Sequence, residues 1–428
     1  MSQSTGSVVI IGGGLIGAAC ADALTRRGWQ VTLLDAGRFA GACSHANCGF
    51  VCPSHVLPLA EPGAVRQALA AMLKPNSPFS IKPRFDPALW SWLLRFARRC
   101  NHRDMLHTAH ALHPLLESSH ALYAEMMAES DFATACEWQT GGLLFVYQTA
   151  AALENYAATD RLLTNEFNLP ARRMDGEELV EFEPALKPGL AGGWFYADDA
   201  HLRPDRLMNR WRSRLERQGV TIRENCRGVG FDRAGDDAKS IRIVAADRTG
   251  NSCDEALSAD AFVVTTGASA PEWQRELGCK IPIQPGKGYS ITMPRPERCP
   301  RTPMLLMEHR VGVTPMQSGY RLGSTMEFAG YDDSIQARRL GLLKSGAEHY
   351  LVEPYRDPVE ETWFGWRPMT TDGLPLIGRT PRLKNVWLAA GHNMLGLTLA
   401  PATGQLVAEL MAGEATHVDA RPFRVNRI

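Results

Sequence analysis

The chain has 428 residues, its 46 Lys and Arg equal its 46 Asp and Glu, and hydrophobic residues make up 45% of it. This composition is typical of a soluble globular protein, and the length predicts two closely packed domains. The balanced charge lacks the basic footprint of nucleic-acid-binding proteins, so we expect no nucleic-acid partner.

From the sequence we expect no signal peptide and no membrane span. No basic segment followed by a long apolar run opens the chain, and no stretch approaches the roughly 18 consecutive apolar residues of a transmembrane helix. We therefore expect a cytoplasmic protein. The ten cysteines contain no C-x-x-C pair, so we expect them to be reduced thiols.

The first predicted elements form a strand–turn–helix–strand unit. Residues 8–11 predict a buried strand, residues 18–27 a helix ended by Gly28, and residues 29–37 a second strand. This order is the context in which a glycine-rich turn binds a dinucleotide.

The turn in this unit matches the fingerprint G-x-G-x-x-G through Gly12, Gly14 and Gly17. The first glycine permits the tight turn, the second lets a pyrophosphate reach the backbone, and the third lets helix and strand pack closely. The helix N-terminus, with Leu15 and Ile16, offers amide donors and a positive dipole to the phosphates.

An acidic residue ends the second strand. Asp35 lies eighteen positions after Gly17, where a carboxylate can accept hydrogen bonds from both ribose hydroxyls. An acid here argues against a 2′-phosphate. The acidic residue is compatible with both FAD and NAD, so it does not distinguish between these two cofactors.

Three cysteines, Cys43, Cys48 and Cys52, follow within ten residues. Their spacings match neither a zinc ribbon nor a ferredoxin, and no fourth ligand is evident. We expect small buried thiols and no metal.

Residues 88–100 predict an amphipathic helix. Its apolar and polar faces are formed by Leu89, Leu93, Phe96 and Ala97, and by Ser91, Arg95, Arg98 and Arg99. Two interpretations stay open: the helix packs on its own domain, or it lies on a membrane surface as basic amphipathic helices do.

The middle of the chain predicts a domain built on an antiparallel sheet. Helices are expected over residues 106–130 and 150–167, and short strands over residues 142–147, 192–197, 289–293 and 320–323. This sheet would cover one side of a pocket between two domains.

Two further strands end in glycine. Residues 261–265 precede Gly267, and residues 386–390 precede Gly391. The second strand leads to a helix that begins at Gly396, Leu397 and Thr398 and ends before Gly413. A helix N-terminus stabilises negative charge, which a reduced flavin carries and NAD does not, so this element favours FAD.

These elements predict an α/β protein with a discontinuous Rossmann-type FAD-binding domain and an α+β substrate domain on an antiparallel sheet. We assign residues 1–57, 200–280 and 363–428 to the FAD-binding domain. Residues 58–199 and 281–362 are expected to form the substrate-binding domain.

Four segments show a family resemblance: SHANCGFVCP (residues 44–53), GGLLFVY (141–147), PGKGYSITM (285–293) and WFGWRPMTTDGLPLIGRT (363–380). With these motifs the chain resembles the glycine oxidase and D-amino-acid oxidase superfamily of FAD enzymes, and within it the bacterial D-amino-acid dehydrogenases. The resemblance covers nearly the whole chain and implies FAD as the cofactor.

The resemblance also implies site residues. The first motif, with Ser44 and Asn47, is expected to line the flavin and pyrophosphate. Arg367 is expected to bind the substrate carboxylate, since a guanidinium pairs with a carboxylate bidentately. Tyr289 would donate to the same carboxylate or line the pocket, and His55 would influence substrate choice, because the relatives more often carry an aromatic residue there.

The cofactor is expected to be held without a covalent bond. Some relatives attach FAD through a histidine near the position of His45, but the spacing around His45 differs from theirs.

The expected function is the oxidative deamination of D-amino acids to 2-oxo acids and ammonia, with hydride transfer to flavin N5. Electrons would pass to a non-oxygen acceptor such as a quinone of the respiratory chain, with peripheral contact at the inner face of the membrane. The alternative is an oxidase or dehydrogenase of glycine, sarcosine or a cyclic imino acid such as D-proline or hydroxyproline. A rival from another class is a tRNA-modifying or non-catalytic flavoprotein, which the neutral charge disfavours.

Overall fold

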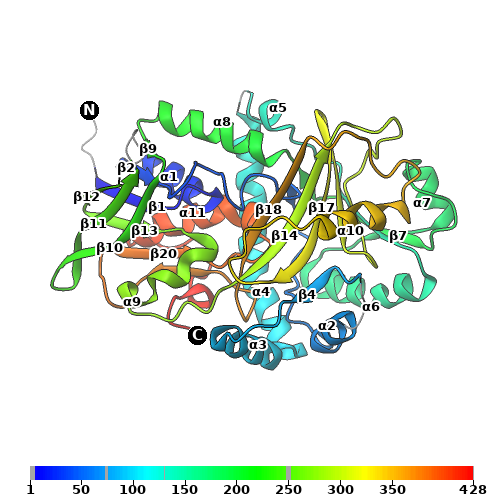
Figure 1. Cartoon of the computed structure of the whole chain (residues 1–428), viewed down its shortest axis with the longest axis horizontal. Coiled ribbons are helices and arrows are strands. Elements are labelled where there is room, and N and C mark those ends of the chain that lie inside the picture. Colours follow the sequence, from blue (N-terminus) through cyan, green and yellow to red (C-terminus); the bar gives the residue numbers. More distant parts are fainter. Residues whose placement is uncertain (1–4, 73–75, 130, 247–251, 428) are drawn as a thin grey trace.

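The computed structural model describes residues 5–72, 76–129, 131–246 and 252–427, and two sheets lie side by side along its long axis (Figure 1). The first sheet has the strand order β19-β20-β13-β1-β2-β9. Its strands are β1 (Gly6–Ile11), β2 (Trp29–Leu34), β9 (Thr221–Arg223), β13 (Ala261–Val264), β19 (Leu376–Arg379) and β20 (Val386–Ala390). All neighbours are parallel except β19 and β20. This sheet is the expected Rossmann-type core.

Small residues let two helices cover one face of this sheet. Helix α1 (Leu15–Arg26) packs against α11 (Gly396–Ala412), and α8 (Pro204–Arg217) lies beside α1. A Cβ added at Gly404 would collide with the carbonyl of Ala19. The two helix axes therefore approach closely only because position 404 has no side chain.

A small antiparallel sheet covers the opposite face. It contains β10 (Cys226–Ala234), β11 (Asp237–Ala246) and β12 (Ser252–Ser258). Side chains such as Ile11, Phe231 and Ile241 are buried between the two sheets. The parallel strands are thus buried on both faces, as their continuous apolar sequences predict.

The second large sheet has nine strands in the order β18-β14-β17-β16-β15-β5-β7-β6, with β4 beside β17. Its members are β4 (Phe79–Ile81), β5 (Leu143–Tyr147), β6 (Arg172–Asp175), β7 (Gly192–Tyr196), β14 (Gln284–Met293), β15 (Met304–Leu306), β16 (Val311–Met316), β17 (Gly319–Phe328) and β18 (Glu361–Met369). Most neighbouring strands are antiparallel, which confirms the expected sheet.

The remaining elements surround these sheets. They are α2 (Ala64–Met72), α3 (Pro87–Arg99), α4 (His102–Ala128), α5 (Phe132–Cys136), α6 (Ala150–Phe167), α7 (Gly176–Phe182), α9 (Gln274–Leu277), α10 (Ala337–Glu348), the 3-10 helices η1 (Gly267–Trp273) and η2 (Arg421–Phe423), and the strand pair β3 (Phe50–Val51) and β8 (Ala200–His201). Helix α4 begins earlier than expected because Asn101 caps its first turn, and Ser130, its expected end, lies outside the described residues.

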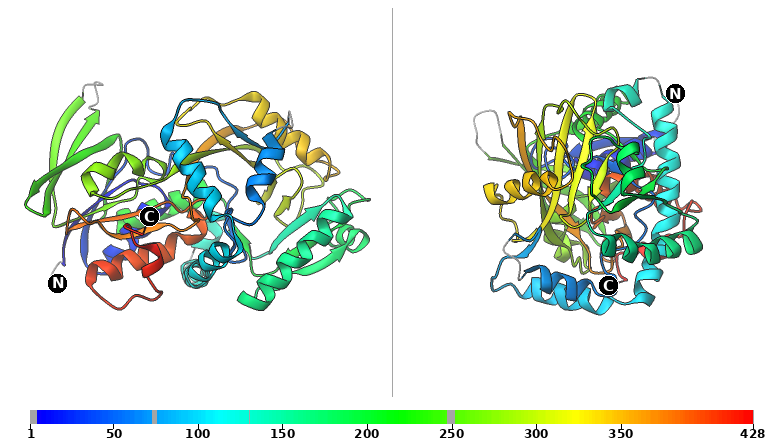
Figure 2. Two further views of the ribbon diagram at one scale, coloured as in Figure 1. Left: turned by 90° about the horizontal axis from the view of Figure 1, so that it is seen from below. Right: turned by 90° about the vertical axis from the view of Figure 1, so that its right-hand side faces the viewer.

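The structure corrects one expected domain boundary. Residues 363–369 belong to β18, which pairs with β14 along its whole length, so they lie in the antiparallel sheet and not in the FAD-binding domain. Helix α4, expected in the substrate domain, packs against α11 and runs between the two halves of the molecule (Figure 2). The rest of the proposed domain division stays a prediction.

The predicted amphipathic helix is α3, and it packs on its own domain. Leu89 and Trp92 are buried against Phe328 and Met369, and the Trp92 indole donates to the Met369 carbonyl (2.9 Å). The apolar face is rotated from the one expected, because Trp92 is buried while Ala97 is exposed. Among the helices that the structure describes, none has the length and apolar character needed to cross a bilayer.

Candidate active site

A cavity of about 2250 Å³ lies between the parallel sheet and the nine-stranded sheet. This volume exceeds the roughly 300–1,000 Å³ of a typical small-molecule site, so it has room for more than one ligand. Most of the predicted cofactor residues line it, namely Gly12, Gly14, Leu15, Ile16, Asp35, Ser44, Asn47, Gly267, Gly396, Leu397 and Thr398. The remaining two, Gly17 and Gly391, do not line it.

The glycine-rich turn brings backbone amides to one end of the cavity. Gly12 has a φ of 114°, and a Cβ there would lie 2.6 Å from the carbonyl oxygen of Thr265. A Cβ at Gly17 would collide with the Gly12 carbonyl, so Gly17 acts by letting the helix approach the turn. Among the described residues, the Gly14 amide has no hydrogen-bond partner and remains available to a ligand in the cavity.

Asp35 both builds the turn and faces the cavity. Its two carboxylate oxygens accept the amides of Gly13 (Oδ2, 2.8 Å) and Gly37 (Oδ1, 2.8 Å). Burial raises the pKa of this carboxyl group, and the two amides oppose the shift. Each oxygen can accept a further hydrogen bond, so Asp35 can still receive ribose hydroxyls.

The loop that follows the first strand pair is tied to helix α1 and to its own backbone. Ser44 Oγ accepts the Leu15 amide (3.0 Å), and Asn47 Oδ1 accepts the Gly49 amide (2.9 Å). Asn47 also donates to the Cys43 carbonyl (3.3 Å), which keeps the loop curved along the cavity wall.

The N-terminus of α11 faces the same cavity and has no side-chain cap. Tyr123 and Ser119 of α4 donate to the carbonyls of Leu397 (2.8 Å) and Thr398 (2.5 Å), which fixes the first turn. The amides and dipole of this 17-residue helix are therefore directed at the cavity, and no side chain in the described part of the chain caps them.

Arg367 projects from β18 into the cavity wall. It lies over Gly288 of the paired strand, where a Cβ would be 2.5 Å from the guanidinium carbon. Its Nη1 donates to the Thr325 carbonyl (2.7 Å), and no carboxylate of the described residues pairs with it. Burial lowers the pKa of this guanidinium. A half-buried cation in the cavity wall, with no acidic partner among the described residues, is ready to bind an anionic ligand.

Tyr289 is among the residues that line the cavity, as one of its two expected roles required, but its hydroxyl does not point toward Arg367. Its hydroxyl donates to Glu327 (2.8 Å), and its side chain is 1% exposed in the core beside α10. Paired strands place Arg367 opposite Gly286 and Tyr289 opposite Phe364, and alternate residues face opposite sides of a sheet. The Tyr289 hydroxyl therefore does not share the face of Arg367.

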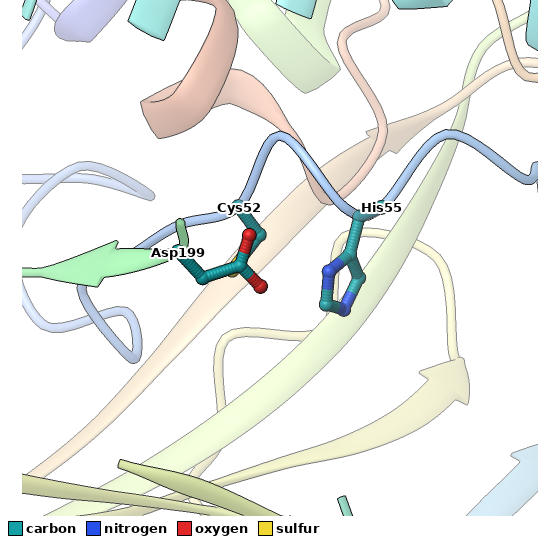
Figure 3. A group of neighbouring side chains, drawn as sticks. All are labelled: Cys52, His55 and Asp199. Atoms are coloured by element: carbon teal, nitrogen blue, oxygen red, sulfur yellow. The ribbon is translucent and has the colours of Figure 1, made fainter. Parts of the chain in front are cut away.

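His55 lines the cavity beside Phe145, its ring edge-on at 5.6 Å. Figure 3 shows it next to two side chains that sequence reasoning did not bring together with it, Cys52 and Asp199. The candidate ligand atoms of these three residues lie within 4.8 Å of one another, and they form the one such group among the described residues. Asp199 is 144 positions away from His55 in the sequence, and its neighbours carry no motif that indicates this contact.

His45 lies outside the cavity-lining residues and is paired elsewhere. Its Nε2 is 2.6 Å from Glu361 Oε1. The cysteines whose side chains are described are all unpaired, and burial raises the pKa of the thiols of Cys43, Cys48 and Cys52.

These features fit FAD. A free amide at Gly14 and the N-terminus of α1 suit a pyrophosphate, Asp35 suits a ribose, and the uncapped α11 suits the electron-rich edge of a flavin. The positions lie along one continuous cavity, as a dinucleotide requires.

Comparison with known proteins agrees with this geometry. The family model "FAD dependent oxidoreductase" (DAO) matches residues 7–410. D-amino acid dehydrogenases of Paramagnetospirillum magneticum and Methylobacterium radiotolerans are each 30% identical to the chain, over 98% of it and 98% and 99% of their own lengths. Glycine oxidase of Geobacillus kaustophilus has a similar fold, with a TM-score of 0.77 at 22% identity over 99% of this chain and all of the other. The chain belongs to the DAO family of FAD-dependent oxidoreductases.

Proposed function

We propose that this protein is an FAD-dependent D-amino-acid dehydrogenase that converts D-amino acids to 2-oxo acids and ammonia. The observation that carries the proposal is Arg367, a half-buried guanidinium in the wall of the cofactor cavity with no acidic partner among the described residues. The relatives that are named D-amino acid dehydrogenases match 98% of the chain and support the substrate class.

In this proposal the protein binds and orients while the cofactor supplies the redox chemistry. FAD, when bound, accepts a hydride at N5. Arg367 holds the substrate carboxylate with two parallel hydrogen bonds, which fixes the direction of the Cα–H bond. Gly288 keeps the space above β14 free for the guanidinium. The apolar cavity wall limits access of water to the reacting carbon.

We propose that FAD is held without a covalent bond. His45, the histidine considered for attachment, is engaged by Glu361 and does not line the cavity.

The proposed electron acceptor is an apolar molecule such as a quinone, taken up at a membrane surface. Helices α2 and α3 leave Leu69, Trp90 and Leu94 exposed by 55–59%, and these side chains also line the cavity. Arg66 and Arg98 are exposed on the same two helices. Exposed apolar and basic side chains on adjacent helices suit contact with an anionic lipid surface.

This membrane contact is tested by sedimentation with vesicles of phosphatidylglycerol and phosphatidylcholine. The double variant Trp90→Ser, Leu94→Ser is expected to bind at least tenfold more weakly than the wild type. Val229→Ser, which changes an exposed apolar residue on β10, should bind like the wild type. Equal binding of all three proteins, or no binding of the wild type, would refute the contact.

The catalytic proposal is tested by adding D- and L-amino acids, including the prolines and glycine, to the enzyme without oxygen and following the flavin absorbance. Bleaching by D-amino acids supports it. Bleaching by glycine or sarcosine alone, with one peroxide per turnover in air, would identify the alternative oxidase. No bleaching by any amino acid would refute both.

A further inference from the structure

Asp199 is a buried acid behind the cavity wall, and the catalytic proposal above gives it no role. It is 1% exposed, and its Oδ1 accepts the amide of Ser54 (3.1 Å) while its Oδ2 accepts the hydroxyl of Ser54 (2.6 Å). Ser54 Oγ in turn lies 3.3 Å from Nδ1 of His55. His55 lines the cavity, so these contacts form a continuous chain from the cavity to a buried carboxyl group. Figure 3 shows the two ends of this chain, His55 and Asp199.

The number of hydrogens in this chain restricts it to two arrangements. A serine hydroxyl has one hydrogen. When Asp199 is ionised, Ser54 donates to it and must accept from Nδ1–H, so Nε2 of His55 carries a lone pair. When Asp199 is protonated it donates to Ser54, Ser54 donates to Nδ1, and Nε2 carries the hydrogen. Among the described residues Nε2 has no hydrogen-bond partner, which leaves it free for a ligand.

We propose that His55, Ser54 and Asp199 form a relay that takes one proton from the substrate ammonium group to the Asp199 carboxylate. The inference rests on the proposed function. First, an N–H bond of the ammonium group breaks and an Nε2–H bond forms on His55. The Nδ1–H bond of His55 then breaks as a new O–H bond forms on Ser54. Finally, the original O–H bond of Ser54 breaks as an O–H bond forms on Asp199. No group is oxidised or reduced in this step, and the substrate keeps a neutral amine.

The reaction requires such a step because the nitrogen lone pair must form the C=N bond as the hydride leaves Cα. An amino acid enters as an ammonium ion near neutral pH and has no lone pair to offer. A proton acceptor positioned in the cavity therefore raises the rate at neutral pH, where general bases typically contribute about 10²–10⁴-fold.

The relay suits a site in which a charged imidazole is unfavourable. Burial lowers the pKa of His55 to about 4, and within the described ranges no carboxylate forms a hydrogen bond or ion pair with its ring. Transfer through Ser54 lets His55 receive a proton at Nε2 and release one at Nδ1, so the ring stays neutral in both arrangements.

Asp199 can hold the transferred proton. Burial raises the pKa of Asp199 to about 7, although the hydrogen bonds from Ser54 and from the Cys52 thiol lower this pKa. The titratable groups that act on it are Cys52, Asp198 and Tyr196, and none of these is a cation that would keep it ionised.

The test measures the limiting rate of flavin reduction by a D-amino acid, without oxygen, as a function of pH. Ser54→Ala and Asp199→Asn should lower this rate about 100-fold at pH 7. Above the pKa of the substrate's own amine, where the substrate arrives with a lone pair, both variants should come within about threefold of the wild type. Ser54→Thr keeps the hydroxyl and should retain most of the rate at pH 7. Ser345→Ala removes a cavity hydroxyl that has no buried acid partner and should behave as the wild type.

If the variants reduce the flavin more slowly than the wild type by the same factor at both pH values, the residues have a structural role and the relay is overturned. A normal rate in Ser54→Ala at pH 7 would also overturn the relay. One bound metal ion per chain in the purified holoenzyme would also overturn it, because Cys52, His55 and Asp199 would then act as ligands. If Asp199→Asn loses FAD, the pair Ser54→Ala and Ser54→Thr decides the question. Absence of flavin reduction in the wild type would refute the proposed function and is seen before any variant is made.

Discussion

Replacement of Arg367 tests the substrate site most sharply, because this side chain contributes little to the stability of the fold. In Arg367→Ala the protein loses one hydrogen bond to the Thr325 carbonyl and a half-buried positive charge that no described acid neutralises. These two effects oppose each other, so we expect FAD content and Tm close to those of the wild type.

The expected loss lies in substrate capture. A hydrogen bond to a charged group contributes about 1.5–3 kcal/mol. Two parallel bonds to the carboxylate contribute about 3–6 kcal/mol, and since each 1.36 kcal/mol is a factor of ten, kcat/KM should fall about 10²–10⁴-fold. Arg367→Lys keeps the charge without the bidentate geometry and should fall between the wild type and Arg367→Ala.

Gly288→Ala is the counterpart of Arg367→Ala, because it changes the position of the Arg367 guanidinium without removing its charge. The new Cβ would be 2.5 Å from the guanidinium carbon of Arg367 and must push it aside while its charge is retained. A displacement of about 1 Å predicts roughly a 10²-fold loss. Arg310→Gln removes a different cavity-lining arginine, which is exposed, and serves as the control.

The assay is anaerobic stopped-flow reduction of the flavin over a range of D-amino-acid concentrations. An unchanged KM and reduction rate in Arg367→Ala would refute the assignment of the carboxylate site.

Three further predictions follow from the structure. Gly17→Ala should purify without FAD, because its Cβ collides with the Gly12 carbonyl, and a normal flavin spectrum would contradict this role. Acid precipitation should leave the yellow colour in the supernatant, whereas a yellow pellet would show covalent FAD. The ion pair of His45 and Glu361 raises the pKa of the histidine and lowers that of the glutamate, so it stabilises the fold most between about pH 4.3 and 6.5 and loses its effect as the pH rises through the raised histidine pKa. His45→Gln should therefore lower Tm at pH 6 more than at pH 9, and an equal shift at both would contradict the pairing.

The sequence predicts the Rossmann-type half well because its signals are local. The turn that contains Gly12 and Gly17 and the strand end at Asp35 are determined within about thirty residues, and the structure places them as one compact unit. Four strands of the second sheet, β5, β7, β14 and β17, are also predicted, since each contains a short apolar run between turn residues. The predicted ranges cover only part of β14 and β17, and the other five strands of this sheet are not predicted.

The remaining features depend on contacts between distant segments. All ten residues of β14 are buried, so no alternation in its sequence shows which face borders the cavity, and the side of Tyr289 could not be predicted. The partner of β18 is a strand about seventy residues earlier, and no local pattern specifies that pairing. Asp199 reaches Ser54 across 145 positions through a loop without a recognisable motif.

The most direct test of the proposed function is a single anaerobic turnover with matched D- and L-enantiomers of one amino acid. The account predicts that the D-enantiomer bleaches one flavin per chain and yields one 2-oxo acid and one ammonia, while the L-enantiomer leaves the flavin oxidised. Reduction by the L-enantiomer alone, or bleaching without release of a 2-oxo acid, would contradict it.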